Sequence, residues 1–289
     1  MKTITIIGAG RLGTSLGTAL ARQGYIIKAL SCRSLKSCRE SRRLIGQGDV
    51  FTDNLQAASQ GQIVFLTPPD DIIPQVAAEL ASASDDWSHK FVFHCSGLLT
   101  SLMLEPLRKL GARTASLHPM QTFASKTLKP QAFREIYFGL EGDAQALIMA
   151  QKITHTLGGK HLILQPEDKP LYHTAGSMAS NFLVVLFDVA VRFLERLTNS
   201  EEEAAAMLFP LVQETLQNVK EFDASSALTG PIIRGDKTTL KKHLEAIQAF
   251  PEQKTIYLHL AAEALRMAGR AERLSAQELK EMQALLEEK

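Results

Sequence analysis

The chain has 289 residues, of which 45% are hydrophobic and 22% are charged. Its 32 Lys and Arg residues almost balance its 31 Asp and Glu residues, leaving a net charge of +1 at pH 7. This balance argues against nucleic acid or an anionic membrane as the main partner and favours a small-molecule substrate. The length favours two domains over one.

The ends and the cysteines indicate the compartment. The opening MKTITIIGAG runs into a strand and a glycine turn, without the basic and long apolar regions of a signal peptide. No segment is expected to be apolar for long enough to span a bilayer. Cys32, Cys38 and Cys95 are odd in number and lack CxxC spacing, which is typical of reduced thiols. We therefore expect a cytoplasmic protein without a membrane partner.

The first half of the chain alternates β-branched runs with amphipathic stretches, from TITII (3–7) to RTASL (113–117). This alternation predicts an α/β domain with a mostly parallel sheet and right-handed crossovers. The sheet is expected to continue through IYFGLEG, a helix near 143–157 and KHLILQ. The first domain is therefore placed at residues 1–165.

The first half opens with IIGAGRLG, in which Gly8, Gly10 and Gly13 follow a strand and precede a helix in G-x-G-x-x-G order. The first glycine permits a tight turn, the second lets the backbone approach a pyrophosphate, and the third allows close packing. The helix start, with Arg11 and Leu12, adds free amides and a positive dipole. The motif predicts a Rossmann-type dinucleotide-binding domain; a glycine turn without a ligand is the alternative.

The tip of the second strand indicates which dinucleotide is bound. An NAD site requires a carboxylate there for the ribose hydroxyls, and KALSCRSLK has none. Ser31, Arg33 and Ser34 are instead donors suited to a ribose 2′-phosphate. We therefore predict NADP, with NAD as the alternative cofactor and a solvated surface charge as the alternative interpretation of Arg33.

Three further strand ends are expected at the same edge of the sheet. Thr67, Pro68 and Pro69 form a rigid loop that is expected to lie along the cofactor, with an N-cap at Asp70 or Asp71.

The other two strand ends carry Ser96 and His118, at the carboxyl edge where a nicotinamide ring is expected. Hydride transfer to or from an alcohol or carbonyl needs an acid or base that titrates near neutrality. We expect His118 to exchange this proton and Ser96 to donate a hydrogen bond to the same oxygen. Purely structural roles for both residues are the alternative. His94 and Cys95 point to opposite faces of a strand, so no metal site is expected there.

From Glu167 onward the sequence is almost entirely helical, which predicts an all-helical substrate and dimerisation domain at residues 166–289. Pro170 and Pro251 mark two helix starts, and SEEE (200–203) and SAQE (275–278) are capping boxes.

Two features of this helical half concern its packing. NFLVVLFDVAV (181–191) is apolar nearly all the way round, so it is expected to be buried, with a subunit interface as one way to bury it. Pro210 is expected to kink or break the helix that follows Ser200.

The helical half also supplies candidate site residues. In KPLYHTAGSMASN, His173 belongs to a polar stripe with Asn181 beside it, for which a cleft over the cofactor or close helix packing are the two explanations. In LTGPIIRGD, Arg234 is a candidate ligand of a substrate carboxylate, with an interdomain ion pair as the alternative.

Four motifs together, GAGRLG, SLHPMQTF, YHTAGSMASN and ALTGPIIRGD, resemble bacterial proteins that combine a Rossmann-like domain with a DUF2520 domain. That family is similar in layout to the 6-phosphogluconate dehydrogenase-like superfamily, which includes pyrroline-5-carboxylate reductases and prephenate dehydrogenases. The resemblance to prephenate dehydrogenases implies a catalytic role for His118 and a supporting role for Ser96. HPMQTF departs from their motif because the following glycine is missing.

The resemblance also implies a homodimer whose cleft is completed by helices. The paired Lys and Asn, four residues apart, of hydroxyacid dehydrogenases are not found, because Lys169 and Asn181 are twelve residues apart. The sequence thus predicts an NADP-dependent oxidoreductase acting on a small, anionic hydroxy, keto or imino substrate. A non-catalytic NADP-binding protein and a prephenate- or arogenate-type dehydrogenase are the alternatives.

Overall fold

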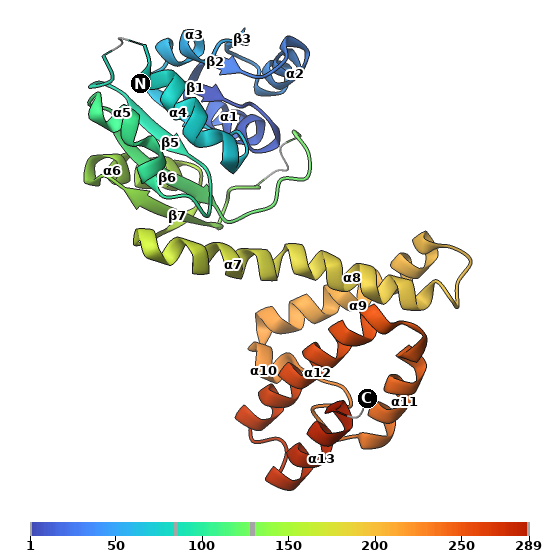
Figure 1. Cartoon of the computed structure of the whole chain (residues 1–289). Helices are drawn as coiled ribbons and strands as arrows, with labels where there is room; N and C mark the ends of the chain where they lie inside the picture. Colours follow the sequence, from blue (N-terminus) through green and yellow to red (C-terminus); the bar gives the residue numbers. More distant parts are fainter. Residues whose placement is uncertain (1, 84–85, 128–130, 288–289) are drawn as a thin grey trace. The chain divides into compact units, whose positions relative to one another are not determined.

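The computed structural model describes residues 2–83, 86–127 and 131–287 (Figure 1). The chain divides into two compact units, Met1–Phe182 and Leu183–Lys289, which we call the sheet unit and the helical unit. This division lies beyond the boundary expected at residues 165 and 166. The reason is that the helix starting at Lys169 sends its buried side chains into the sheet.

The sheet unit contains an eight-stranded sheet with the order β3-β2-β1-β4-β5-β6-β7-β8 (Figure 1). All neighbouring strands are parallel except β6 and β7, so the predicted mostly parallel sheet and its continuation are confirmed. The strands are β1 (Thr3–Ile7), β2 (Ile26–Ser31), β3 (Asp49–Phe51), β4 (Ile63–Leu66), β5 (Phe91–His94), β6 (Arg113–Pro119), β7 (Tyr137–Gly142) and β8 (Lys160–Ile163).

Helices cover both faces of this sheet. In β4, Phe65 faces a core shared with α1, α2 and α6, whereas Val64 and Leu66 face a core shared with α3, α4 and α5. This alternation follows from the two-residue period of a strand, and burial on both faces explains the unbroken apolar runs. The helices of this unit are α1 (Arg11–Arg22), α2 (Leu35–Ile45), α3 (Asn54–Ser59), η1 (Asp70–Ile72), α4 (Ile73–Ala81), η2 (Ser101–Leu104), α5 (Glu105–Lys109), α6 (Ala144–Thr156), η3 (Pro166–Asp168) and α7 (Lys169–Ala179).

The helical unit begins within α8 and has its own core, which includes Leu240, Leu265 and Met282. The two predicted capping boxes start helices: Ser200 accepts from the amide of Glu203, and Ser275 and Glu278 bond reciprocally. The helices are α8 (Asn181–Leu194), α9 (Glu201–Glu221), α10 (Ala224–Ala227), α11 (Lys237–Ala246), η4 (Ile247–Ala249), α12 (Pro251–Arg270) and α13 (Ala276–Glu287).

The structure of the single chain bears on two expectations about this half. α9 is not broken at Pro210; it runs on through this residue. The apolar stretch 181–191 is not buried as a whole, because Val184 and Val185 are 68% and 51% exposed and Val189 and Val191 are buried. The periodicity correctly indicated a helix with too many apolar positions for one buried face, but the chain by itself does not cover them all.

The helical stretch Pro166–Leu194 is long and apolar enough, by length and composition, to cross a membrane. The expectation that no segment meets this criterion is therefore wrong. One such helix is weak evidence for a membrane span. Its first part also carries the buried Lys169 and the half-buried Tyr172, which bond to residues of the sheet. One face of this part of the stretch therefore contacts the sheet.

Candidate functional site

The glycine motif forms the turn between β1 and α1. Gly8 has φ +81°, and a Cβ at this position would lie 2.7 Å from the backbone nitrogen of Pro68. The amides of Gly8 and Ala9 donate to the carbonyl of Ser31, which ties the turn to the end of β2. A Cβ at Gly13 would collide with Thr67 Oγ1. The first and third glycines therefore have the turn and packing roles expected of them.

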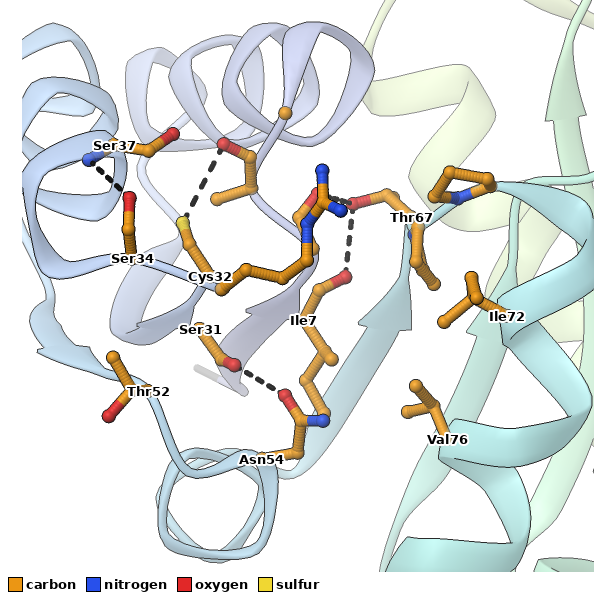
Figure 2. Close-up of a pocket in the computed structure, with 16 residues that line it drawn as sticks. Ile7, Ser31, Cys32, Ser34, Ser37, Thr52, Asn54, Thr67, Ile72 and Val76 are labelled. Carbon is orange, nitrogen blue, oxygen red and sulfur yellow. Dashed lines mark hydrogen bonds between the residues drawn. The ribbon is translucent and has the colours of Figure 1, made fainter.

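A cavity of about 480 Å³ lies against this turn, between the ends of β1, β2 and β4. Figure 2 shows Ser31, Ser34 and Thr52 on one side and Ile72 and Val76 on the other. A Cβ at Gly10 would meet only the Gly8 carbonyl, at 3.7 Å, so this glycine keeps one wall open. The lining comprises Ile7, Gly8, Ala9, Gly10, Ser31, Cys32, Arg33, Ser34, Ser37, Thr52, Asn54, Thr67, Pro68, Pro69, Ile72 and Val76.

Most of the predicted cofactor residues line this cavity, and three do not. Arg11 is exposed at the first position of α1, Leu12 packs against the core, and Gly13 is buried. The amides of these first-turn residues have no acceptor within the helix, so they remain available to an anion. Their contribution is therefore through the backbone.

Within the described part of the chain, none of the residues that line the cavity is Asp or Glu. The nearby Asp53 accepts bonds from the amides of Leu55 and Gln56 and so caps α3. Ser31 Oγ donates to Asn54 Oδ1 at the cavity wall. Sequence reasoning missed Asn54 and Ser37 because the three-residue strand β3 and the position of the first turn of α2 gave no distinct signal.

A second group of side chains lies at the carboxyl ends of β5 and β6. Ser96 is 4% exposed, and its Oγ donates to Asp70 Oδ2 at 2.6 Å while accepting from the amides of Leu98 and Leu99. The hydroxyl group of Ser96 therefore uses its one hydrogen to donate to Asp70. Asp70 directly follows Pro69 of the cavity wall, so this bond joins the cavity to the strand ends. Asp70 does not cap η1, contrary to expectation, because Pro69 holds that position.

Lys169 is a residue of this group that sequence reasoning missed. It is fully buried, and its Nζ donates to Ser116 Oγ at 2.8 Å and to the Ser96 carbonyl at 3.3 Å. Burial lowers the pKa of Lys169 to about 8, against the opposing effect of Glu141 and Asp70. The signal available in the sequence was its position four residues before His173, which places both on one helix face.

His118 lies beside this lysine and contacts α7. Its Nδ1 is 3.0 Å from Tyr172 Oη, and the two rings meet edge to face. A Cβ at Gly139, the residue paired with His118 in β7, would lie 2.7 Å from the Tyr172 ring. Burial, Lys169 and His173 together lower the pKa of His118 to about 4. The imidazole is therefore neutral at pH 7.

The imidazoles of His118 and His173 both lie next to Gly97. A Cβ at Gly97 would lie 2.8 Å from His173 Nδ1 and 3.0 Å from His118 Nε2. The ring centroids of His118 and His173 are 6.2 Å apart. We call Ser96, Gly97, His118, Lys169, Tyr172 and His173 the strand-end cluster.

Two other predicted site residues lie outside this cluster. Asn181 is exposed at the start of α8. Arg234 belongs to the helical unit, where its exposed side chain lies in the turn before α11. Bonds from Thr239 lower the pKa of Asp236, and the charge of Arg234 adds to this effect. Neither residue is among those that the sheet unit gathers around His118.

His94 has a structural role. Its Nδ1 accepts from the amide of Ser96 at 3.2 Å, and its Nε2 is 3.1 Å from the carbonyl of Thr100, to which it donates. Burial and the charge of Lys169 lower the pKa of His94 to about 3. Both ring nitrogens are occupied by backbone groups, so neither is free to bind a metal ion.

Two family models match different parts of the chain, and one match ends and the other begins within the sheet unit. Residues 2–119 match the model of the Rossmann-like domain, and residues 136–264 match the model of DUF2520, a domain of unknown function. The chain combines a Rossmann-like domain with a DUF2520 domain. The DUF2520 match starts at β7 and includes α7, so Lys169, Tyr172 and His173 belong to it. None of the curated proteins matches the sequence.

Solved structures share this fold. A protein from Thermotoga maritima is 28% identical, with a TM-score of 0.72 over 94% of this chain and 100% of its own. A Bacteroides fragilis protein provisionally assigned as an NADP oxidoreductase is 24% identical, with a TM-score of 0.76 over 91% and 97%. A reductive aminase from Aspergillus terreus, in complex with NADPH and ethyl-5-oxohexanoate, is 17% identical, with a TM-score of 0.61 over 99% and 93%.

The expected layout is confirmed by this set of structures, which also includes a pyrroline-5-carboxylate reductase and a prephenate dehydrogenase. At identities below 25%, these likenesses concern the fold.

Proposed function

We propose that this Rossmann-like and DUF2520 protein is an NADP-dependent oxidoreductase. It would transfer hydride between the nicotinamide and a small, anionic hydroxy, keto or imino substrate. The observation that carries the proposal is the Ser96–Asp70 bond, which joins a carboxylate-free dinucleotide cavity to a cluster containing a neutral imidazole. The NADP oxidoreductase and the NADPH complex among the similar structures support the choice of cofactor.

The cavity suits this cofactor. Its volume lies within the range of ligand pockets, and Gly10 leaves room for a pyrophosphate beside the first-turn amides of α1. Ser31, Arg33 and Ser34 would hold the ribose 2′-phosphate, since all three line the cavity and none of the lining residues is acidic. When bound, NADP supplies the hydride donor or acceptor. The chain itself binds the nucleotide, orients the substrate and moves the proton.

His118 is the proposed proton acceptor in the oxidative direction. Its pKa of about 4 lies below the near-neutral value expected from the sequence, because the ring is buried beside Lys169. The imidazole is therefore unprotonated at neutral pH and can accept a proton from a hydroxyl group, but as a weaker base than expected. Tyr172 Oη can accept from Nδ1–H while donating to the His118 carbonyl, 3.5 Å away. This arrangement leaves the lone pair of His118 Nε2, which lies next to Gly97, available to accept the proton.

The other predicted residues, together with Lys169, have proposed supporting roles. Ser96 would position the strand end through Asp70, and Lys169 would keep His118 neutral by its charge. His173 would be a second acid or base. Asn181 would orient the reacting oxygen or imine, and Arg234 would hold the anionic group of the substrate.

The test is hydride exchange, followed at the nicotinamide absorbance band with a panel of 2-hydroxy acids, keto acids and cyclic imino acids. We expect one class to react, and His118→Ala to reduce the rate by about a hundredfold or more. His155→Ala, a change at an exposed histidine of α6, is the matched control and should retain the rate. Thermal stabilisation by NADPH without hydride exchange would favour the non-catalytic binding protein. Exchange with prephenate or arogenate alone would identify the third alternative.

We also propose that the protein is a cytoplasmic homodimer. Its three cysteines are free, which suits a reducing compartment. The exposed apolar side chains of α8 and α9, among them Val184, Val185 and Leu216, form the surface that a second copy would cover. Light scattering after size exclusion should give twice the chain mass, and Val184→Glu with Val185→Glu should give the monomer. A monomeric wild-type protein would contradict this assembly.

A further inference from the structure

Lys126 lies in the segment that follows β6 and has no role in the site described so far. Its side chain is 19% exposed. Its Nζ donates to Ser37 Oγ at 2.8 Å, to the Ser37 carbonyl at 3.2 Å and to Glu40 Oε2 at 2.8 Å. Ser37 belongs to the first turn of α2 and lines the dinucleotide cavity. The ammonium group is therefore one hydrogen bond from the cavity wall.

The segment that carries Lys126 is anchored on its N-terminal side. His118 and Pro119 end β6 before it, and the Phe123 ring packs 5.2 Å from Phe133 against the core. The chain thus passes from the strand-end cluster to α2 within eight residues, from His118 to Lys126. A side chain held in this way has lost much of its rotamer freedom already, so little more is lost when it binds a ligand.

We propose that Lys126 binds the 2′-phosphate of NADP and thereby selects NADP over NAD. The inference rests on the proposed NADP-dependent function and extends its phosphate site beyond Arg33 and Ser34. An ammonium group has three donors, and here all three are directed to Ser37 and Glu40. A bound phosphate would take the place of Glu40 while the bonds to Ser37 remain.

Charge favours this exchange. The phosphate carries about −1.5 to −2 at pH 7, whereas the Glu40 carboxylate carries a single charge and is exposed to solvent. Lys126 lowers the pKa of Glu40, so this carboxylate is ionised and neutralises the lysine while the cavity holds no phosphate. NAD has a hydroxyl group in place of the phosphate and cannot displace Glu40. The Glu40–Lys126 pair would therefore persist with NAD and open with NADP.

The experiment titrates the full-length protein with NADPH and with NADH, following the fluorescence of the reduced nicotinamide. Lys126→Met should weaken NADPH binding about tenfold or more, the size expected for a lost charge-assisted bond, and change NADH binding less than about twofold. Lys126→Arg should retain most of the preference. Glu40→Gln should strengthen NADPH binding alone, because the competing carboxylate is gone.

Controls separate this inference from folding and from the proposed function. Lys109→Met, the same change at an exposed lysine of α5, should leave both titrations unchanged, and thermal melting checks that each variant is folded. Equal losses for both nucleotides, or no loss in Lys126→Met, would overturn the role of Lys126 while the NADPH preference of the wild type stands. A wild-type protein that binds neither nucleotide, or prefers NADH, would overturn the proposed function and this inference together.

Discussion

The dinucleotide cavity and the strand-end cluster lie in one sheet unit but are built in opposite ways. The cavity wall consists of backbone at Gly8 and Gly10 and of exposed side chains such as Arg33. The cluster is largely withdrawn from solvent, because Lys169 is fully buried, Ser96 is 4% exposed, and His118, Tyr172 and His173 are half-buried. Recognition in the cavity therefore depends on backbone shape and surface charge, whereas the cluster depends on desolvated, mutually bonded groups. Substitutions in the two regions should differ in what they change.

The largest effect is expected at Gly8, the one cavity position where shape also sets stability. Gly8→Ala introduces a Cβ 2.7 Å from the Pro68 backbone at φ +81°, so it should cost about 4 kcal/mol and abolish NADPH binding. Gly46→Ala is the matched control, because it has φ +87° and open space around it, and should cost about 1 kcal/mol. Urea unfolding measures both. Equal losses would show that the approach to Pro68 is unimportant.

Lys169 tests the desolvation of the cluster. Its folded pKa of about 8 lies below the ordinary value of 10.5, so the unfolded chain binds more protons between these pH values. Wild-type stability relative to Lys169→Met should therefore rise by about 3 kcal/mol as the pH increases from 8 to 10.5. Chemical unfolding across this range measures the difference. A flat difference, as expected for the exposed Lys109→Met, would mean that Lys169 is solvated.

His118 gives the corresponding window in acid. Its folded pKa of about 4 lies below 6.5, so the unfolded chain again binds more protons between the two values. The wild type should lose about 3 kcal/mol relative to His118→Gln as the pH falls from 6.5 to 4, as for Lys169, because the two pKa shifts have the same size. Imidazole signals in NMR titrations provide the direct measurement. A pKa of His118 near 6.5 would contradict the buried, neutral imidazole.

The smallest effect is expected at Gly97, where the neighbours are side chains that can move. Gly97→Ala places a Cβ 2.8 Å from His173 Nδ1 and 3.0 Å from His118 Nε2, so the rings must shift at a cost of about 1 to 2 kcal/mol. Nucleotide binding should be retained, but hydride exchange should fall. If NADPH binding is lost while hydride exchange per bound nucleotide stays normal, then Gly97 serves nucleotide binding and not the reaction, contrary to the account.

The same difference explains what the sequence could predict. The glycine motif is local, so its turn and its packing followed from one short segment. Half of the cavity lining was predicted, from this motif and from the ends of two further strands. The cluster joins β5, β6 and α7, and no sequence spacing shows that Lys169 meets Ser116, 53 residues away. The sequence predicted that the Ser96 hydroxyl donates to the substrate, because it could not show that Asp70, on another loop, accepts this hydrogen bond. The apolar pattern of 181–191 predicted a helix correctly but not how much of it one chain covers.

The most direct test of the account is a structure of the protein with NADP bound. The account predicts the pyrophosphate at the first-turn amides of α1, the 2′-phosphate between Arg33 and Lys126, and the reactive nicotinamide carbon facing His118 across Gly97. An empty cavity at saturating nucleotide, or a nicotinamide ring on the other side of the sheet from His118, would contradict it.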